Sequence, residues 1–485
     1  MATSTKLDTS RLAQLLGSWS SGRGPLYQQL AAAVAALIEQ GVLRDGAVLP
    51  PERGLADTLA VSRSTVVSAF NLLREQGHIE RRQGSGSRVV ADHVPGPDRG
   101  PMRSAPLFDR GEETRALLQA VPHCLLDLST ELRLLADAWP VPPENVDSEG
   151  FWPLRQAIAE RYRDQGLPTD ASHILVANGT QQACSLILAE VCRPGDVVLC
   201  ESLTWPGLTD SVERLGARCH GVPMDDDGII VAELRAAIER LRPAVVVVNP
   251  HHHNPTGVRT TPARRRELAD IAADYGVLMV EDRVFADVAY DGVVPLPLSS
   301  HRPDAPIAVI DSLSKTVWCG LRIAWIRASP DLIGRLRFVK AIDDLGSATP
   351  SQLLALQLMP RLDDLVEQRR TELAERAAWA HKLITELLPD WTIPPAEGGA
   401  SLWAAMPEPV VRPFVHHAAR SGVLLVSDEL FSVSKVAGRH IRLPFTAPEA
   451  DIVDAFERLA HAWSTFDPGD GSPTRPGLTE SPTLV

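Results

Sequence analysis

The chain has 485 residues, of which 44% are hydrophobic, and its formal net charge is −13. This length predicts about two to four domains with sizeable cores, and the acidic balance excludes a protein that is basic throughout. No apolar run reaches the roughly 18–20 residues that span a bilayer, the first residues lack the apolar stretch of a signal peptide, and six cysteines without a CxxC pair predict reduced thiols and a cytoplasmic location.

Charge is unevenly distributed along the chain. Residues 22–90 contain eight arginines, no lysine and six acidic residues, so this segment is +2 and the remainder is −15. A mildly basic head on an acidic body favours a local contact with nucleic acid.

Three helices are predicted within residues 22–90. The first follows Pro25 and ends at Gly41, and the second begins after the prolines at 50–51, where helices accept proline. The third runs over 63–76 behind Ser62, which has the character of an N-cap.

Two short strand-like runs, 79–82 and 87–90, flank the glycine-rich sequence 83–86 and predict a hairpin. Helices followed by such a hairpin make a winged helix-turn-helix. Small hydroxyls and one arginine at the start of the third helix suit contacts with phosphates and base edges in the major groove. A lone serine at a helix start is usually only a cap, so the prediction depends on the whole set. The candidate DNA-binding residues are Arg53, Ser62, Arg63, Ser64, Thr65, Gly84 and Gly86.

The rest of the chain divides by composition. Residues 91–112 are rich in proline, glycine and charge, which predicts a linker. Residues 113–465 alternate apolar strand-like runs with amphipathic helices, which predicts a parallel sheet covered on both faces. We expect residues 466–485 to be a disordered tail.

Polar motifs follow several of the predicted strands, where open α/β sheets place their ligands. Gly179 opens a helix and offers a phosphate cradle of main-chain N–H groups. An aromatic at Trp205 could stack on a ring or belong to the core, the amide of Asn254 could donate to a phenolate, and Asp282 could hold a pyridine nitrogen protonated.

The sequence Ser312-Leu313-Ser314-Lys315, with Arg322 seven residues later, adds the remaining groups. An amine forms an imine with an aldehyde, hydroxyls bind phosphate oxygens, and a guanidinium clamps phosphate. Pyridoxal 5'-phosphate (PLP) matches these requirements.

The head resembles the GntR family of bacterial regulators. The resemblance spans about 65 residues and rests on Pro25-Leu26-Tyr27-Gln28-Gln29-Leu30, on the block from Gly41 to Ala56, on Ser62-Arg63-Ser64-Thr65-Val66 and on Gly84-Ser85-Gly86.

The body resembles the fold type I aminotransferases over about 330 residues, because the motifs above occur in that family's order. The resemblance implies that Lys315 forms the Schiff base with PLP and that Arg442, in His440-Ile441-Arg442, binds an effector carboxylate. It also implies a set of cofactor-binding residues: Gly179, Thr180, Gln181, Trp205, Asn254, Asp282, Ser312, Ser314, Lys315 and Arg322.

Two features depart from the family's pattern. A tyrosine usually stands two or three residues after the aspartate, but here Val284 and Phe285 occupy those positions. The absent hydroxyl predicts inefficient turnover, because a donor to the phenolate favours its charged form. The histidines at 251–253 invite a metal interpretation, but no further ligand cluster is evident, so no metal is expected and a place for His252 or His253 near the cofactor is favoured.

A GntR-type head joined to such a body resembles the MocR subfamily. The fold class expected is a winged helix-turn-helix of α+β type followed by an α/β fold type I PLP-dependent aminotransferase-like domain, with a smaller α+β subdomain from about 335. The resemblance implies a PLP-dependent transcriptional regulator that binds operator DNA as a homodimer, arranged head to tail, and that senses PLP itself or an amino compound. The alternatives are an active aminotransferase with an accessory DNA-binding domain, and a DNA-binding protein whose body never holds PLP.

Overall fold

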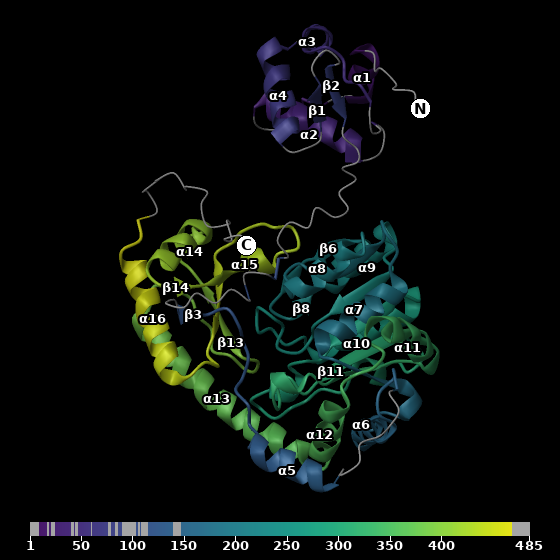
Figure 1. The fold of residues 1–485 in the computed structure, drawn as a ribbon. Helices are drawn as coiled ribbons and strands as arrows, with labels where there is room; N and C mark the ends of the chain where they lie inside the picture. Colours follow the sequence, from purple (N-terminus) through teal and green to yellow (C-terminus); the bar gives the residue numbers. More distant parts are fainter. Residues whose placement is uncertain are drawn as a thin grey trace. The chain divides into compact units, whose positions relative to one another are not determined.

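The computed structural model describes residues 9–16, 19–20, 25–39, 43, 47–59, 61–75, 79–82, 86–89, 103–104, 107, 115–138 and 147–467. The chain divides into two compact units, residues 1–100 and residues 101–485, which are described separately (Figure 1). Within the described part, no helix is both long and apolar enough to cross a membrane.

The first unit contains four helices around one core. The helices are α1 (Thr9–Leu16), α2 (Leu26–Glu39), α3 (Glu52–Leu59) and α4 (Arg63–Glu75). Helices α2 to α4 match the three that the sequence predicts. Helix α1 was not predicted, and it completes the core because Leu12 is fully buried among the apolar residues of the other three helices.

A hairpin follows α4. Strand β1 (Ile79–Arg82) pairs antiparallel with β2 (Gly86–Val89), as the sequence predicts. Val48, in the chain before α3, forms an isolated antiparallel bridge with Arg88 of this hairpin. Gly84, predicted for the tip of the hairpin, lies outside the described residues.

The second unit is built on a seven-stranded sheet. Valine, isoleucine and leucine dominate its strands, as expected for strands covered on both faces. The strands, in spatial order, are β4 (Ile174–Ala177), β12 (Ala324–Arg327), β11 (Ile307–Ser312), β10 (Leu278–Asp282), β9 (Val245–Val248), β5 (Val197–Glu201) and β6 (Arg218–Val222).

One strand corrects the prediction of a parallel sheet. Strand β12 runs antiparallel to both of its neighbours, β11 and β4, so the sheet is mixed. Only residues 313–323 separate β11 from β12. A parallel return needs a crossover of about a dozen residues or more, usually a helix. The chain therefore turns back directly, and this short connection contains Lys315.

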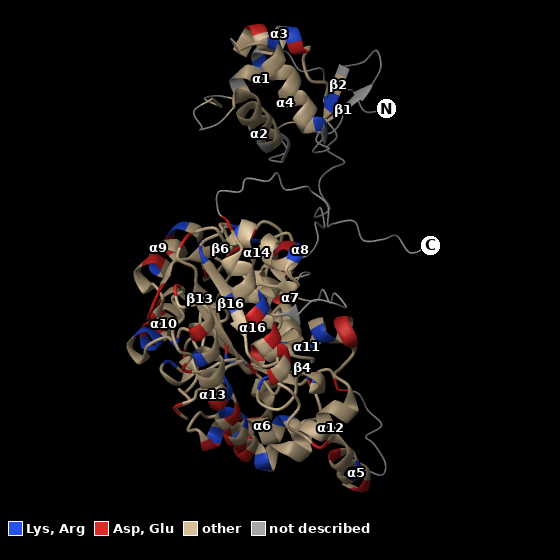
Figure 2. Ribbon diagram, turned by 90° about the vertical axis from the view of Figure 1, so that its left-hand side faces the viewer, with Lys and Arg blue, Asp and Glu red and all other residues tan. Residues whose placement is uncertain are grey.

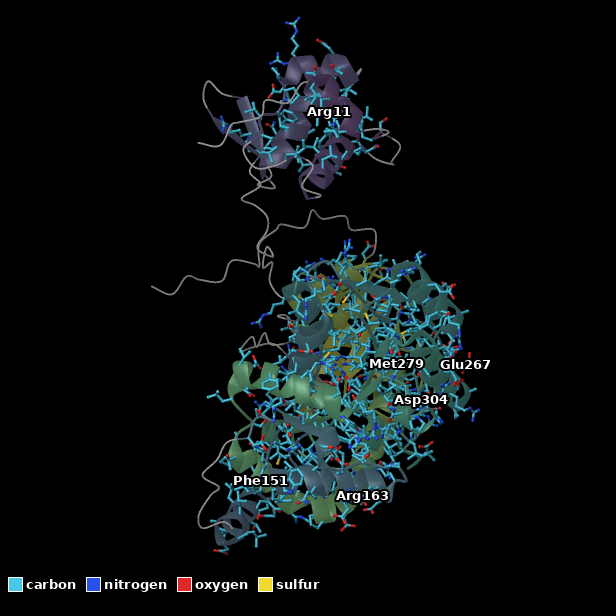
Figure 3. All side chains as sticks on the ribbon, turned by 90° about the vertical axis from the view of Figure 1, so that its right-hand side faces the viewer. Arg11, Phe151, Arg163, Glu267, Met279 and Asp304 are labelled. Atoms are coloured by element: carbon cyan, nitrogen blue, oxygen red, sulfur yellow. The ribbon has the colours of Figure 1, made fainter. Side chains whose placement is uncertain are left out.

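Helices cover both faces of the sheet (Figure 1). On one face pack α7 (Thr180–Val191), α8 (Pro206–Arg214) and α11 (Pro330–Asp344). On the other pack α9 (Val231–Leu241) and α10 (Pro262–Tyr275), and, beside β4, α6 (Trp152–Asp164) and α12 (Thr349–Leu358). Helix α10 has one exposed and one buried face, because Glu267 is exposed while Leu268 next to it is fully buried. Figure 3 labels Glu267 and also Met279 of strand β10.

A smaller lobe follows the long helix α13 (Leu362–Leu387). Its three-stranded sheet has the order β13 (Ser401–Ala405), β16 (His440–Pro444) and β15 (Val426–Ser427). Helices α14 (Val411–Arg420) and α16 (Glu449–Ser464) complete its core. The short helix α15 (Asp428–Phe431) leads from β15 back toward β16. Lys and Arg lie beside Asp and Glu on the helices of the second unit, for example on α9 and α10 (Figure 2).

Part of the predicted linker packs on the second unit. Of residues 91–112, the structure describes 103, 104 and 107, and Leu107 is buried. Beyond it, β3 (Arg115–Ala116) pairs with β14 (Val423–Leu424) of the smaller lobe. Of the predicted tail, residues 468–485 lie outside the described residues.

Candidate cofactor and DNA-binding sites

A cavity of about 680 Å3 opens at the carboxyl ends of β5, β9 and β10. This is where an open α/β sheet is expected to bind ligands. Nine of the eleven residues that the sequence singles out in the body line it: Thr180, Gln181, Trp205, Asn254, Asp282, Ser314, Lys315, Arg322 and Arg442. Of the other two, Gly179 directly precedes Thr180, and Ser312 is hydrogen-bonded to Ser314.

An anion cradle lies at the start of α7. Gly179 is the N-cap of this helix and has a φ of 93°, a conformation that favours glycine. A Cβ at Gly179 would collide with the guanidinium of Arg322, whose Nη2 donates to the carbonyl oxygen of Asn178 at 2.6 Å. The free N–H groups of the first helical turn and an arginine therefore lie close together, as an anionic phosphate requires.

The two serines of the lysine loop have different roles. Ser314 lines the cavity, whereas Ser312 is not among the lining residues. The hydroxyl of Ser312 lies 2.9 Å from that of Ser314 and 3.1 Å from the carbonyl oxygen of Ile323, and it accepts a hydrogen bond from the N–H of Ser314. Ser312 therefore fixes the shape of the loop from which Ser314 and Lys315 enter the cavity.

The amine of Lys315 is held between main chain and aromatic ring. Its Nζ donates to the carbonyl oxygen of Ala120 at 2.6 Å and lies 5.5 Å from the centre of the Phe285 ring. Burial, with a contribution from the positive charge of Arg442, lowers the pKa of Lys315 to about 8. A larger share of this amine is therefore neutral, and so nucleophilic, at physiological pH than for an exposed lysine.

Two buried carboxylates line the cavity at neighbouring strand ends. Burial raises the pKa of Asp282 to about 6, although its side chain accepts a 3.0 Å hydrogen bond from the N–H of Val284. Burial also raises the pKa of Glu201 to about 7. Asn249 joins the two, because its N–H donates to Glu201 at 2.7 Å and its side-chain amide donates to the carbonyl oxygen of Asp282 at 3.4 Å.

Sequence reasoning missed Glu201 and Asn249. Glu201 is the last residue of β5, and Asn249 directly follows β9. A position at the end of a predicted strand was the only feature of the sequence that pointed to them. Neither residue belongs to a spacing pattern with a chemical meaning of its own.

Arg442 enters the cavity from the smaller lobe. Its Nη1 donates to the side-chain oxygen of Asn254 at 3.0 Å, its Nη2 donates to the carbonyl oxygen of Leu118, and its guanidinium lies 4.9 Å from the ring of Phe431. Its Nε is buried and has no hydrogen-bond partner among the described residues. Burial lowers the pKa of Arg442 to about 10, so the group remains cationic at neutral pH and can pair with an anion.

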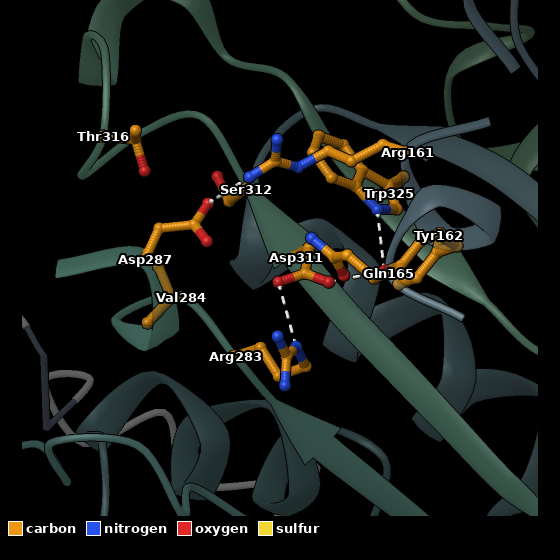
Figure 4. Close-up of a pocket in the computed structure, with 10 residues that line it drawn as sticks. All are labelled: Arg161, Tyr162, Gln165, Arg283, Val284, Asp287, Asp311, Ser312, Thr316 and Trp325. Atoms are coloured by element: carbon orange, nitrogen blue, oxygen red, sulfur yellow. Dashed lines mark hydrogen bonds and ion pairs between the residues drawn. The ribbon is translucent and has the colours of Figure 1, made fainter. Parts of the chain in front are cut away.

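A network of charged and polar side chains surrounds Asp311, at the end of β11 before the lysine loop (Figure 4). Asp311 of β11 accepts a hydrogen bond from the hydroxyl of Tyr162 and lies 3.4 Å from Arg283, while Trp325 donates to Tyr162 at 3.0 Å. Thr316, next to Lys315, lines the same small pocket. These contacts join the ends of β10 and β11, from which Asp282 and the lysine loop enter the cavity.

The two departures noted in the sequence have structural counterparts. Val284 and Phe285 line the cavity, and no tyrosine is among the described residues that do so. His251 lies 3.0 Å from buried Glu281, and His253 lies 2.8 Å from the hydroxyl of Thr256. None of residues 251–253 is among the residues that line the cavity. In the described part of the chain, no cluster of three or more His, Cys, Asp and Glu side chains could hold a metal.

On the first unit, the candidate DNA contacts gather at the start of α4. The hydroxyl of Ser62 accepts a hydrogen bond from the N–H of Thr65 at 3.1 Å, so Ser62 is the predicted N-cap. The hydroxyls of Ser64 and Thr65 both lie 2.8 Å from that of Ser62. The Arg63 side chain is 70% exposed and lies 3.9 Å from Glu52. Arg53 on α3 is also exposed, and Gly86 begins β2.

Comparison with protein families shows to which family each unit is related. The family "Aminotransferase class I and II" matches residues 145–459, and the family "Bacterial regulatory proteins, gntR family" matches residues 26–89. The chain belongs to the class I and II aminotransferases and carries a gntR-family domain at its N-terminus. This fusion is the architecture of MocR-like GntR transcriptional regulators.

Individual relatives show the same two-part organisation or match the body alone. The HTH-type transcriptional regulator YdfD of Bacillus subtilis is 26% identical over 453 residues, 87% of this chain and 92% of that protein. The pyridoxine biosynthesis transcriptional regulator PdxR of Corynebacterium glutamicum is 29% identical over 61% of this chain and 65% of its own. Aromatic-amino-acid aminotransferase 1 of Thermococcus litoralis is 29% identical over 64% of this chain and 78% of its own.

Solved structures confirm the fold of the body. An archaeal alanine:glyoxylate aminotransferase matches with a TM-score of 0.70 at 24% identity and covers 77% of this chain and 99% of its own. The α-aminoadipate aminotransferase LysN of Thermus thermophilus matches with a TM-score of 0.68 at 21% identity, over 76% of this chain and 97% of its own. The expected fold class, a helix-turn-helix head on a fold type I body with a smaller C-terminal sheet, is therefore confirmed.

The lowered pKa of Lys315 predicts how uptake of an aldehyde such as PLP depends on pH. Only the neutral amine is nucleophilic, so the rate should rise about tenfold per pH unit below about pH 8 and level off above it. The rise in visible absorbance after mixing apoprotein with PLP measures this rate. Arg442→Gln removes a nearby positive charge and should move the plateau to higher pH, whereas Arg439→Gln, at an exposed site, should not. A rate that still climbs through pH 10 would show that the amine is not perturbed.

Proposed function

We propose that this protein is a transcriptional regulator whose body holds PLP and controls DNA binding by its head. The observation that carries the proposal is one cavity that brings together a buried amine, a buried carboxylate and a glycine–arginine cradle, on a chain whose other unit is a gntR-type domain. Lys315, Asp282, and Gly179 with Arg322 supply these groups.

The residues of the cavity fit PLP. When bound, PLP supplies an aldehyde that a lysine amine can attack and a ring that accepts electrons. Lys315 offers a buried, partly neutral amine, and Asp282 offers a buried carboxylate able to pair with a pyridine nitrogen. Gly179 lets the guanidinium of Arg322 approach the main chain where a Cβ would collide with it. Trp205, fixed by a 2.8 Å hydrogen bond from its indole N–H to Gln181, presents a flat surface for stacking.

Arg442 supports an amino compound with a carboxylate as the effector. The guanidinium is buried, and its two described hydrogen bonds go to neutral oxygens of Asn254 and Leu118. An incoming carboxylate would replace neutral acceptors with a charged one, which makes a stronger hydrogen bond. PLP itself is the other candidate signal, and the similarity to a regulator named for pyridoxine biosynthesis supports it.

The head supports recognition of double-stranded DNA. Helix α4 begins with Arg63, Ser64 and Thr65 behind the Ser62 cap, so its positive end carries groups that bond phosphates and base edges. Arg53 and the hairpin with Gly86 lie in the same unit and are candidates for backbone contacts.

A second copy of the chain is the partner that the surface of the body favours. Helix α11 and the residue after it expose apolar side chains, with Phe338 at 62%, Ile342 at 90% and Leu345 at 73% of their full accessible surface. Adjacent exposed apolar residues of this size are typical of protein interfaces. A dimer would present two heads to two half-sites, at a spacing that the dimer sets.

An active aminotransferase is the second candidate function, favoured by the retention of Lys315, Asp282 and Arg442 in one cavity. Phe285 weighs against efficient turnover, because its ring lies beside the lysine without the hydroxyl that the family usually provides. Transamination half-reactions across the amino acids discriminate between the candidates. Rates of about 1–1000 per second would favour the enzyme.

Arg63→Ala should weaken binding to DNA that the protein selects from a random pool by about 1–3 kcal/mol, because it removes a contact at the start of the recognition helix. Uptake of PLP, followed by visible absorbance, should not change. Fluorescence anisotropy with labelled DNA measures the affinity, and Arg11→Ala, an exposed arginine on α1, is the matched control. Equal affinity of Arg63→Ala and wild type would overturn the assignment of α4.

Lys315→Ala should abolish the visible absorbance that PLP produces on covalent attachment, because no other lysine is among the described residues that line the cavity. DNA binding should remain, but its response to PLP should disappear. Arg302→Ala, a surface residue paired with Asp304, serves as the control. A variant that kept the full response would mean that Lys315 does not carry the signal.

Ile342→Asp should dissociate the dimer, because a charge would replace an apolar side chain at the centre of the exposed patch. The dimer should weaken by about 2 kcal/mol or more, as for central interface residues. Sedimentation velocity across protein concentrations measures this, and Val436→Asp, at a 65% exposed site in the smaller lobe, is the control. Unchanged sedimentation of Ile342→Asp would place the interface elsewhere.

A further inference from the structure

A short segment of main chain accepts hydrogen bonds from two cationic side chains that line the cavity, Lys315 and Arg442. Lys315 donates to the carbonyl oxygen of Ala120 at 2.6 Å, and Arg442 donates to the carbonyl oxygen of Leu118. Leu118 and Ala120 are 5% and 7% exposed, so their carbonyl groups have little access to water. The two groups that we propose for the aldehyde and the effector carboxylate are therefore both held by residues 117–121.

This segment is joined to residues that precede it in the chain. The side-chain amide of Gln119 donates to the carbonyl oxygen of Leu107 at 2.8 Å. Leu107 is 2% exposed and belongs to one apolar cluster with Leu118 and Phe431, the ring beneath Arg442. Trp205, the proposed stacking residue, packs against the same cluster.

Arg103 and Ser104 fasten this part of the chain to α8. Asp210 accepts hydrogen bonds from the N–H of Arg103 at 2.8 Å, from the N–H of Ser104 at 2.9 Å and from the hydroxyl of Ser104 at 2.6 Å. The Arg103 guanidinium donates to Glu213 at 3.0 Å and to the carbonyl oxygen of Ser432 at 3.2 Å. We call Arg103, Ser104 and Leu107 the strap, because they tie α8 to the smaller lobe across the rim of the cavity, which Ser104 and Leu107 line.

We propose that residues 117–121 and the strap form a ligand-operated latch that transmits occupancy of the cavity toward the head. This inference rests on the proposed function and adds its route. Residues 90–102 join the last strand of the head to the strap, so the strap is the first described part of the body that the chain reaches after the head.

The chemistry of the ligands releases the latch. When an aldehyde reacts with the Lys315 amine, a C=N bond forms and the aldehyde oxygen leaves as water with two protons of the amine. The nitrogen then keeps at most one proton, whose direction the planar C=N bond fixes, so its hydrogen bond to the Ala120 carbonyl is weakened or lost. A carboxylate at Arg442 competes with the Leu118 carbonyl in the same way. A buried carbonyl without a donor is unfavourable, so the segment shifts to new partners, and Gln119 passes this shift to Leu107.

Hydrogen–deuterium exchange of the full-length protein tests the latch. Adding PLP to the apoprotein should protect peptides that contain the cradle at Gly179 and Thr180. The same addition should speed exchange about fivefold in peptides over 101–107 and 116–122, because a shifted segment opens more often the bonds of its own N–H groups, such as those of Arg103 and Ser104 to Asp210 and of Leu117 to the carbonyl oxygen of Leu424. Uptake of PLP with slowed or unchanged exchange in these two regions would overturn the latch alone. Failure to take up PLP would overturn the proposed function and the latch with it.

Gln119→Leu uncouples residues 117–121 from the strap. It keeps the size of the side chain but cannot donate to Leu107. The exchange rise at 116–122 should remain on adding PLP, the rise at 101–107 should be lost, and the PLP effect on affinity for selected DNA should fall below about twofold. Gln368→Leu, at an exposed site on α13, should behave as wild type. A Gln119→Leu protein that keeps both the rise at 101–107 and the full PLP effect on DNA affinity would contradict the route.

Discussion

The burial of one amine organises the body of this protein. Lys315 reaches the cavity because the connection between β11 and β12 is too short for a crossover, so the chain turns back at once and forces β12 to run antiparallel. The end of this connection places Ile323, whose carbonyl oxygen accepts a hydrogen bond from the hydroxyl of Ser312 and so fixes the loop. The topology of the sheet and the position of the amine are thus consequences of the same eleven-residue connection, residues 313–323.

Burial acts on acids and bases in opposite directions, and this cavity contains both. It lowers the pKa of Lys315 to about 8 and raises those of Asp282 and Glu201 to about 6 and about 7. Burial therefore disfavours the charged forms of the acids and of the amine alike. A ligand that brought a positive pyridine nitrogen to Asp282 and a negative phosphate to the cradle would pair with groups whose charged forms burial disfavours. Such a cavity gains more from a zwitterionic cofactor than an exposed site would.

Much of this arrangement could be predicted from the sequence, because it depends on local patterns. The helices of the head follow from apolar spacing and from the Ser62 cap, and the cavity residues follow strands in an order that a known family shares. The segment around Gln119 and the strap could not be predicted. Their hydrogen bonds join residues far apart in the chain, as between Arg103 and Ser432, and no periodicity or motif marks them. Glu201 and Asn249 were missed for a related reason, because a single polar residue at a strand end has no pattern until the sheet brings strand ends together. The direction of β12 follows from the length of the loop 313–323, a feature of the sequence on which the prediction of a parallel sheet did not depend.

A regulator and an enzyme make different demands on the same groups. An enzyme must stabilise a transition state more than its substrate, whereas a sensor needs a ligand that binds two states of the protein with different affinity. The ring of Phe285 offers no hydroxyl for chemistry at the lysine, but the carbonyl groups of Leu118 and Ala120 accept hydrogen bonds from Arg442 and Lys315 that an incoming ligand would have to displace. A ligand shifts the equilibrium only by the difference between what it gains and what it displaces. In the proposed regulator these carbonyl groups would supply that difference within the cavity itself, so Lys315 and Arg442 would bind the ligand and also start the switch.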